Sequence, residues 1–294
     1  MTTLHTLRAR TRGWANSMLV LAALMAVTGT VSVAGLLLDD RLLGGQPIWA
    51  KPFKFSVSIG LYAVAWAWLA SLTTRAPRLL RWSSRTIALL IGMEMVFIIG
   101  QVLRGRASHF NNETDFDSTV FQIMGVAIGT VWVLTFVLTT LVMRSDIPGR
   151  ATRSAVRLGA AISLAGIAVA LLMTGPTPEQ LQQLKADERP PAIGAHAVGV
   201  ADGGPALPIL GWSTTGGDLR IPHFVGMHAL QVLPLVAMAL TVLAARWPAL
   251  RGERTRTRLV RIAAAGYFGL TALVTWQALR GQSIVDPDLL TLGA

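Results

Sequence analysis

Seven apolar runs, each long enough to cross a bilayer, alternate with polar segments along the chain. A transmembrane helix needs about 20 predominantly apolar residues. Because lipid offers the backbone no hydrogen-bond partners, each run is expected to be a helix and not a strand. The pattern predicts an all-α polytopic transmembrane helix bundle of about seven spans, forming a single domain over residues 1–294. The runs lie at about 14–38, 54–72, 86–103, 118–143, 155–174, 222–245 and 258–279.

Charge alternates between the two sides of this bundle. Arginines cluster before the first run and in the segments that follow the second, fourth and sixth runs, whereas most acids lie in the other segments. Arginine-rich short loops stay in the cytoplasm. The expected orientation therefore has the N-terminus inside and the C-terminus outside. A chain rich in arginine and alanine and free of cysteine is typical of a bacterial protein, so the predicted location is the bacterial cytoplasmic membrane.

One outer segment, 175–221, is long for a connector in a compact bundle, which indicates a functional loop or a folded cap. It opens with Thr177, Pro178 and Gln180, which predict a capped surface helix that continues to Arg189. A stretch rich in glycine and proline follows at 194–217, where little helix is expected.

The composition of the chain indicates which kinds of partner the protein can have. Only 14% of the 294 residues are charged, although the formal net charge is +11; a soluble domain carries roughly a quarter charged residues. The arginines sit in short clusters between apolar runs, so they favour the lipid bilayer as a partner and argue against nucleic acid. The absence of cysteine excludes disulfides, thiolate metal sites and cysteine nucleophiles.

Polar residues of the third run point to a site at its outer end. If the helix continues far enough, Glu94, Gln101, Ser108 and His109 line one stripe that rises to the outer surface. Because an ionised glutamate facing lipid is costly, the stripe is expected to face the interior. The alternative is that Glu94 is protonated and hydrogen-bonds a neighbouring helix.

The start of the sixth run carries a second polar group. Asp218 is expected to cap this helix or to form an ion pair with Arg220. His223, His228 and Gln231 follow within the helix, where histidines often mark function. The alternatives are a hydrogen-bonded core histidine for His228 and a plain surface residue for His196 in the long loop.

Some basic residues lie on the outer side, although basic residues are expected mainly on the cytoplasmic side. The basic residues of the segments 49–55 and 104–111 anchor the helices at the interface, pair with loop acids, contact lipid headgroups or bind an anionic substrate. On the last interpretation, the substrate-binding candidates are Lys54, Gln101, Arg104, Ser108, Asn111, Arg220 and Gln231.

Three classes of function fit these residues, and whether the protein is an enzyme stays open. The first is a redox protein that binds haem b or a metal, with imidazoles from facing helices as ligands. The second is a zinc-dependent membrane hydrolase of a lipid-derived substrate, with Glu94 or Asp218 as the catalytic base. The third is a carrier or binding protein for a small molecule or lipid that enters from the outside. The candidate ligands for zinc, iron, copper or haem are His109, His196, His223 and His228.

Four segments of the sequence are similar to segments of a known family: WAKPFKF (49–55), RGRASHFN (104–111), DGGPALP (202–208) and GWSTTGGDLRIPHFVGMHALQ (211–231). They resemble segments of a family of bacterial polytopic membrane proteins with about seven helices, for which no activity is established. The resemblance covers most of the chain. It implies the same topology and assigns no catalytic residue.

Overall fold

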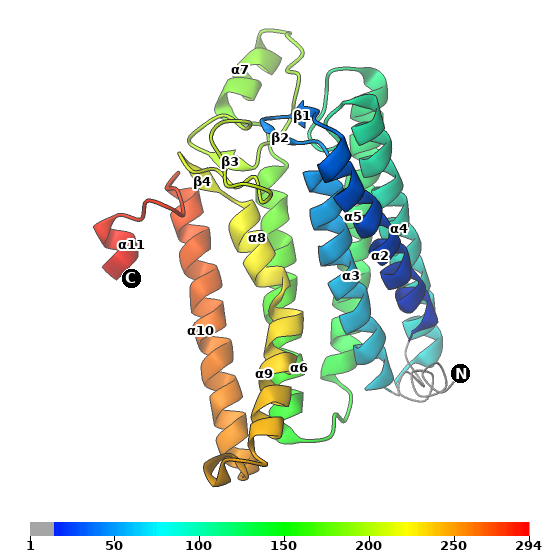
Figure 1. Ribbon diagram of the computed structural model, residues 1–294, viewed down its shortest axis with the longest axis vertical. Coiled ribbons are helices and arrows are strands. Elements are labelled where there is room, and N and C mark those ends of the chain that lie inside the picture. Colours follow the sequence, from blue (N-terminus) through cyan, green and yellow to red (C-terminus); the bar gives the residue numbers. More distant parts are fainter. Residues whose placement is uncertain (1–14, 74, 294) are drawn as a thin grey trace.

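The computed structural model describes residues 15–73 and 75–293, and it is a bundle of long, roughly parallel and antiparallel helices (Figure 1). Six of these helices are long and apolar enough to cross a membrane, and a bent helix pair brings the total to seven if it counts as one span. Strand is confined to two-residue segments, so the all-α prediction is confirmed for the described residues. The arginines of the N-terminal tail and the start of the first predicted span lie outside them.

After the first one, the long helices begin earlier than the apolar runs predict, by up to nine residues. Polar and basic side chains occupy their first turns, where long side chains can reach the interface while the backbone stays helical. In chain order, the bundle contains four long helices, a helix that continues as a 3-10 helix, a bent helix pair and a last long helix. The bounds are α2 (Asn16–Leu38), α3 (Ala50–Ser71), α4 (Pro77–Arg104), α5 (Asp115–Met143), α6 (Arg150–Ala168) with the 3-10 helix η1 (Val169–Met173), the pair α8 (Arg220–Met227) and α9 (Ala229–Leu243), and α10 (Glu253–Leu279).

The predicted sixth span, 222–245, is two helices and not one. Helices α8 and α9 meet at His228 with a bend of 41°. The break places irregular backbone at His228, one of the candidate metal ligands.

Short elements gather at one end of the bundle. They are β1 (Leu42–Leu43) paired with β2 (Gln46–Pro47), β3 (Ala197–Val198) paired with β4 (Gly217–Asp218), α7 (Pro178–Lys185) and the C-terminal α11 (Leu289–Gly293). We call this end, made of residues 39–49, 105–114, 174–219 and 280–293, the loop end; it is uppermost in Figure 1. The opposite end carries the short arginine-rich connections, with the 3-10 helix η2 (Pro248–Leu250), and is called the arginine end.

Helix α7 has the predicted capping box. The Thr177 hydroxyl accepts from the Gln180 backbone, and the Gln180 side chain accepts from the Thr177 backbone. The helix ends at Lys185 and not at Arg189 as predicted. The stretch 194–217 has little regular structure, as expected.

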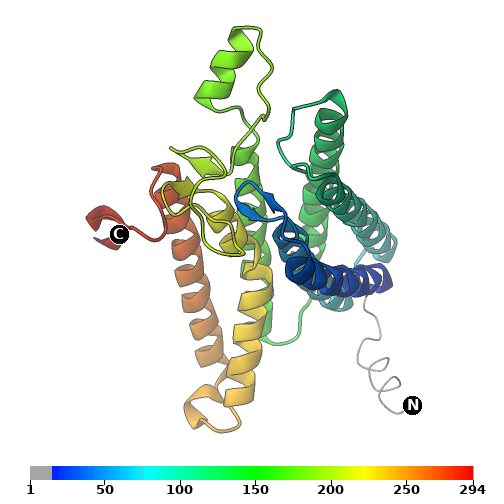
Figure 2. The same ribbon diagram turned by 45° about the horizontal axis from the view of Figure 1, so that its top comes forward.

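Two apolar cores lie within the bundle, and a third, smaller cluster of Phe110, Met173, Leu219 and Ala278 lies at the loop end. The first lies among α2, α3, α4 and α5 and includes Met18, Trp66 and Met124, all nearly inaccessible to solvent. The second lies among α6, α9 and α10 and contains many alanines, which let these helices approach closely. The two groups of helices are also distinct in Figure 2. Contacts of α5 with α6 and of α3 with α9 join them.

The outer face of the bundle is apolar. Leu89 is 72% exposed, Val96 is 68% exposed and Val126 is 74% exposed. A soluble monomer rarely shows such continuous apolar surface. This belt is compatible with a bilayer around the helices and agrees with a multi-pass membrane protein.

Candidate functional site

A Glu–His pair lies where α4 meets the loop end. Helix α4 stops at Arg104 because Gly105 takes a left-handed conformation, with φ of 69°, and its N–H closes the last turn. The chain then folds back, and Nε2 of His109 lies 3.7 Å from Oε1 of Glu94. The prediction that Ser108 and His109 continue the helical stripe of Glu94 is therefore wrong. The loop, and not the helix, brings His109 to Glu94.

Aromatic rings enclose His109. The ring centroids of Phe55, Phe110 and Phe121 lie 5.6, 6.3 and 6.1 Å from that of His109. The imidazole also lies within 3.2 Å of the Ser108 hydroxyl. Burial lowers the pKa of His109 well below its usual value, and the positive charge of Lys51 adds to the effect. The imidazole is therefore neutral at pH 7 beside a buried carboxyl group.

The ammonium group of Lys51 lies near the Glu94–His109 pair. Lys51 lies in the first turn of α3, partly buried, with Nζ 5.7 Å from the centre of the Phe55 ring. It is close enough for its charge to interact with Glu94, His109 and His196. In the part of the chain that the structure describes, Lys51 has no hydrogen bond or ion pair. Lys51 belongs to the basic outer segment 49–55 that the sequence marks out, although only Lys54 of that segment is among the substrate-binding candidates.

His196 approaches the same cluster from the long loop. Its ring centroid lies 4.8 Å from that of Phe110, and Nδ1 lies 2.7 Å from Oδ2 of Asp202. Burial lowers the pKa of His196 and outweighs the opposing effect of Asp202. Burial raises the pKa of Asp202, but hydrogen bonds from His196 and from the backbone N–H of Ala197 outweigh it and hold that pKa well below its usual value. A neutral His196 therefore donates from Nδ1 and leaves Nε2 free to accept.

The long loop contacts Phe110 closely, which requires a glycine at position 194 and a left-handed backbone at Phe110. Phe110 has a φ of 61°, and a Cβ at Gly194 would lie 2.7 Å from the Phe110 ring and 2.5 Å from the Met173 carbonyl oxygen. Only glycine fits here, so the long loop packs directly on the ring that separates His109 from His196.

Lys54 and Arg220 fasten the loop to the bundle. Lys54 Nζ donates to the Leu210 carbonyl at 2.6 Å, and Arg220 donates to the carbonyl of the next residue, Gly211. Arg220 also forms the predicted ion pair with Asp218, which is buried. These two candidates for substrate binding, and the candidate base Asp218, thus all have partners within the protein.

A second network joins α4 to α5. The buried carboxylate of Asp117 accepts from Gln101 at 2.9 Å, from Arg104 at 2.6 Å and from the Thr114 hydroxyl at 2.7 Å. Asn111 stabilises the preceding turn by donating to the Ala107 carbonyl. Gln101, Arg104 and Asn111 therefore serve this junction, and Asp117 was not recognised in the sequence because nothing local marks it.

The histidines of α8 and α9 lie in different surroundings. His223 Nδ1 is 2.9 Å from the Gly166 carbonyl oxygen, at the crossing of α6 and α8. His228 Nε2 is 3.3 Å from the Ser58 hydroxyl of α3, and its ring packs on Phe224 at 4.5 Å. The Gln231 Oε1 atom is buried without a hydrogen-bond partner among the described residues. His223 thus has a structural partner, while His228 and Gln231 keep unused polar atoms.

Helix α3 lies between the two helices that were expected to share a site. It packs on α4 and on α9, whereas the main partners of α4 are α5, α3 and α2. Over residues 15–73 and 75–293, no three His, Cys, Asp or Glu side chains come together as a group that could hold a metal ion. The histidines instead form separate pairs, Glu94 with His109 and His196 with Asp202. Metal or haem ligation stays a prediction.

Comparison with family models, curated proteins and solved structures gives no match to this chain. The family resemblance drawn from the four strings likewise stays a prediction. The geometry of the site is therefore the ground for a functional proposal.

Proposed function

We propose that the chain crosses a bacterial cytoplasmic membrane seven times, with the loop end outside and the arginine end in the cytoplasm. The apolar belt and the bent pair α8–α9, counted as one span, support this topology. The distribution of arginine supports the orientation. In this orientation the long loop covers a site that is reached from the outside.

The function that the site supports best is the binding of a small anion, such as a carboxylate, from the outer side. The observation that carries the proposal is Lys51, a partly buried cation for which the described residues offer no ion-pair partner. Desolvated charges in proteins are normally paired. The neighbouring cations Lys54 and Arg220 already bind the loop, so Lys51 is the cation of this cluster that remains for a ligand.

The neighbours of Lys51 give the bound anion further contacts. A neutral imidazole at His196, with Nδ1 held by Asp202, can take up a proton at Nε2 and then donate a hydrogen bond from Nε2 to the anion. The Glu94–His109 pair, at 3.7 Å, can take up or release a proton as the anion enters. The protein then acts as a binding protein or carrier whose ligand is bound together with a proton.

Titration calorimetry on the full chain in detergent tests this function, with acetate and inorganic phosphate as probes. At least one probe is expected to bind the wild type. Lys51→Gln should weaken that binding by about tenfold or more, because hydrogen bonds to charged groups contribute about 1.5–3 kcal/mol. Lys185→Gln removes the same charge from the exposed end of α7 and should leave binding unchanged. Equal binding to wild type and Lys51→Gln contradicts the proposal.

Metal binding at His196 is the second candidate. A histidine whose Nδ1 is held by a carboxylate is the usual arrangement of a metal-bound imidazole, and Asp202 provides that carboxylate. Elemental analysis of protein purified without chelators tests it. Zinc, iron or copper that is near-stoichiometric in the wild type and lost in His196→Gln supports this candidate, and metal retained in that variant contradicts it.

A further inference from the structure

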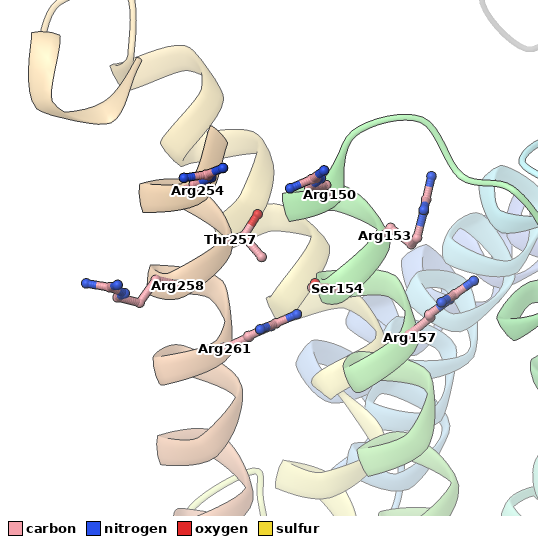
Figure 3. Close-up of a pocket in the computed structure, with 8 residues that line it drawn as sticks. All are labelled: Arg150, Arg153, Ser154, Arg157, Arg254, Thr257, Arg258 and Arg261. Atoms are coloured by element: carbon pink, nitrogen blue, oxygen red, sulfur yellow. The ribbon is translucent and has the colours of Figure 1, made fainter. Parts of the chain in front are cut away.

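A cavity of about 620 Å³ opens between α6 and α10 at the arginine end. Figure 3 shows that its side chains come from both helices: Arg150 and Arg254 extend toward each other, and Arg261 reaches from α10 toward Ser154 of α6. Three guanidinium groups thus converge on one hollow. The rule that cytoplasmic loops are positive explains the sign of these charges, but it does not require two helices to direct them at one point.

The cavity continues into an apolar groove of about 540 Å³ along the same two helices. Arg261 belongs to both, so they meet at this residue. On α6 the lining passes from Ser154 to Leu158, Ala161 and Ala165, which share one face at helical spacing. On α10 the groove is lined by Ala264, Ala265 and Phe268. The result is one continuous furrow, cationic at the membrane surface and apolar below it.

Three of the arginines that line the cavity, Arg150, Arg254 and Arg261, form no ion pair among the described residues, whereas the lining residue Arg153 pairs with Asp146. Glu253, at the start of α10, does not neutralise them, because its carboxylate accepts the backbone N–H of Arg150 and Ala151 at the start of α6. The convergence of three like charges is unfavourable unless an anion lies between them.

We propose that this furrow binds an anionic phospholipid of the inner leaflet. Arginine forks match the geometry of a phosphate group, and the Ser154 hydroxyl adds a donor beside Arg261. The acyl chains would lie along the alanine-lined part of α6 and α10. The furrow runs about 22 Å from Arg150 to Ala165 at about 1.5 Å per residue, which is close to a headgroup plus the roughly 15 Å of hydrocarbon in one leaflet.

The apolar half of the furrow favours a lipid over a soluble anion. A free phosphate would use only the arginines and gain nothing from Ala161 or Ala265, both exposed in the groove. A lipid uses both halves, and basic pockets between transmembrane helices on the cytoplasmic side are a known form of lipid recognition.

Native mass spectrometry of the full chain tests the proposal with phosphatidylglycerol and phosphatidylcholine of identical acyl chains. The wild type should bind phosphatidylglycerol at least about tenfold more tightly, because only its headgroup carries the net negative charge that the three guanidinium groups attract. The triple variant Arg150→Gln, Arg254→Gln, Arg261→Gln should lose this preference. The matched control is Arg78→Gln, Arg81→Gln, Arg85→Gln, which removes the same charge from the exposed face of α4 at the same end.

A second pair of variants tests the apolar half without changing charge. Ala161→Trp with Ala265→Trp fills the groove and should weaken phosphatidylglycerol binding several-fold, whereas Val126→Trp on the exposed face of α5 should not. Inorganic phosphate should compete poorly. Equal binding of the two lipids, an equal loss in the α4 control, or full displacement by phosphate with no effect of the tryptophans would each overturn the proposal.

Discussion

The imidazole of His109 lies 3.7 Å from the carboxyl group of Glu94, although the helix that carries Glu94 ends five residues before the histidine. The contact depends on the turn at Gly105, on the aromatic rings around His109, and on the long loop that packs over them. It joins a residue inside a helix that is long and apolar enough to cross a membrane to the loop end of the bundle.

The stability of the protein should fall as the pH drops below about 6.5, the ordinary histidine pKa. The pKa values of His109 and His196 are lowered in the folded state, so below pH 6.5 the unfolded chain binds protons that the folded chain does not. The folded state therefore loses stability as the pH falls toward the lowered values. Thermal unfolding in detergent at pH 7.5 and 5.5 measures this, and His109→Gln should reduce the difference. A melting temperature equally pH-dependent in wild type and variant would exclude His109 as a source.

Asp117→Asn should destabilise the protein by about 1–3 kcal/mol, because it weakens three hydrogen bonds to a fully buried carboxylate. Asp115→Asn is the matched control two residues away. Its carboxylate pairs with Arg189 but is 95% exposed, and such surface pairs contribute about 0–1 kcal/mol. Denaturant unfolding of both variants measures the difference. Equal losses would show that the Asp117 network does not join α4 to α5.

Gly166→Ala should destabilise the crossing of α6 and α8. A Cβ there would lie 2.3 Å from the Gly226 carbonyl carbon, and overpacking a tight contact costs about 1–3 kcal/mol. Gly125→Ala in α5 is the control, because a Cβ at that position meets nothing within 4 Å; it should be neutral or stabilising. Thermal unfolding compares the two, and a neutral Gly166→Ala would mean that the helices are farther apart than described.

The periodic features of the fold could be predicted from the sequence. Apolar runs of sufficient length predicted the long helices, and Thr177 with Gln180 predicted the capping box, because both signals are local. The helix starts are harder to predict, because long polar side chains can lie within the first turn of a span. The apolar run predicts a second span from residue 54, whereas α3 begins at Ala50 and includes Lys51.

The site was harder to predict because its contacts are made by loops. The stripe from Glu94 to His109 assumed a continuous helix, although Gly105 is the residue type that ends helices in a left-handed turn. Asp117 and Asp202 are not recognisable as site residues in the sequence for another reason. Each acquires its role from partners brought together by tertiary packing, which no spacing along the chain reveals.

The central claim is that Lys51 is an anion-binding cation reached from the outside, and amine labelling tests it most directly. The chain has only three lysines, Lys51, Lys54 and Lys185, so peptide mass spectrometry can follow each one. A membrane-impermeant acylating reagent applied to right-side-out vesicles should modify Lys185 and Lys51, and the anion found by calorimetry should protect Lys51 alone. If Lys51 reacts only in inverted vesicles, or reacts equally with and without the anion, the account is contradicted.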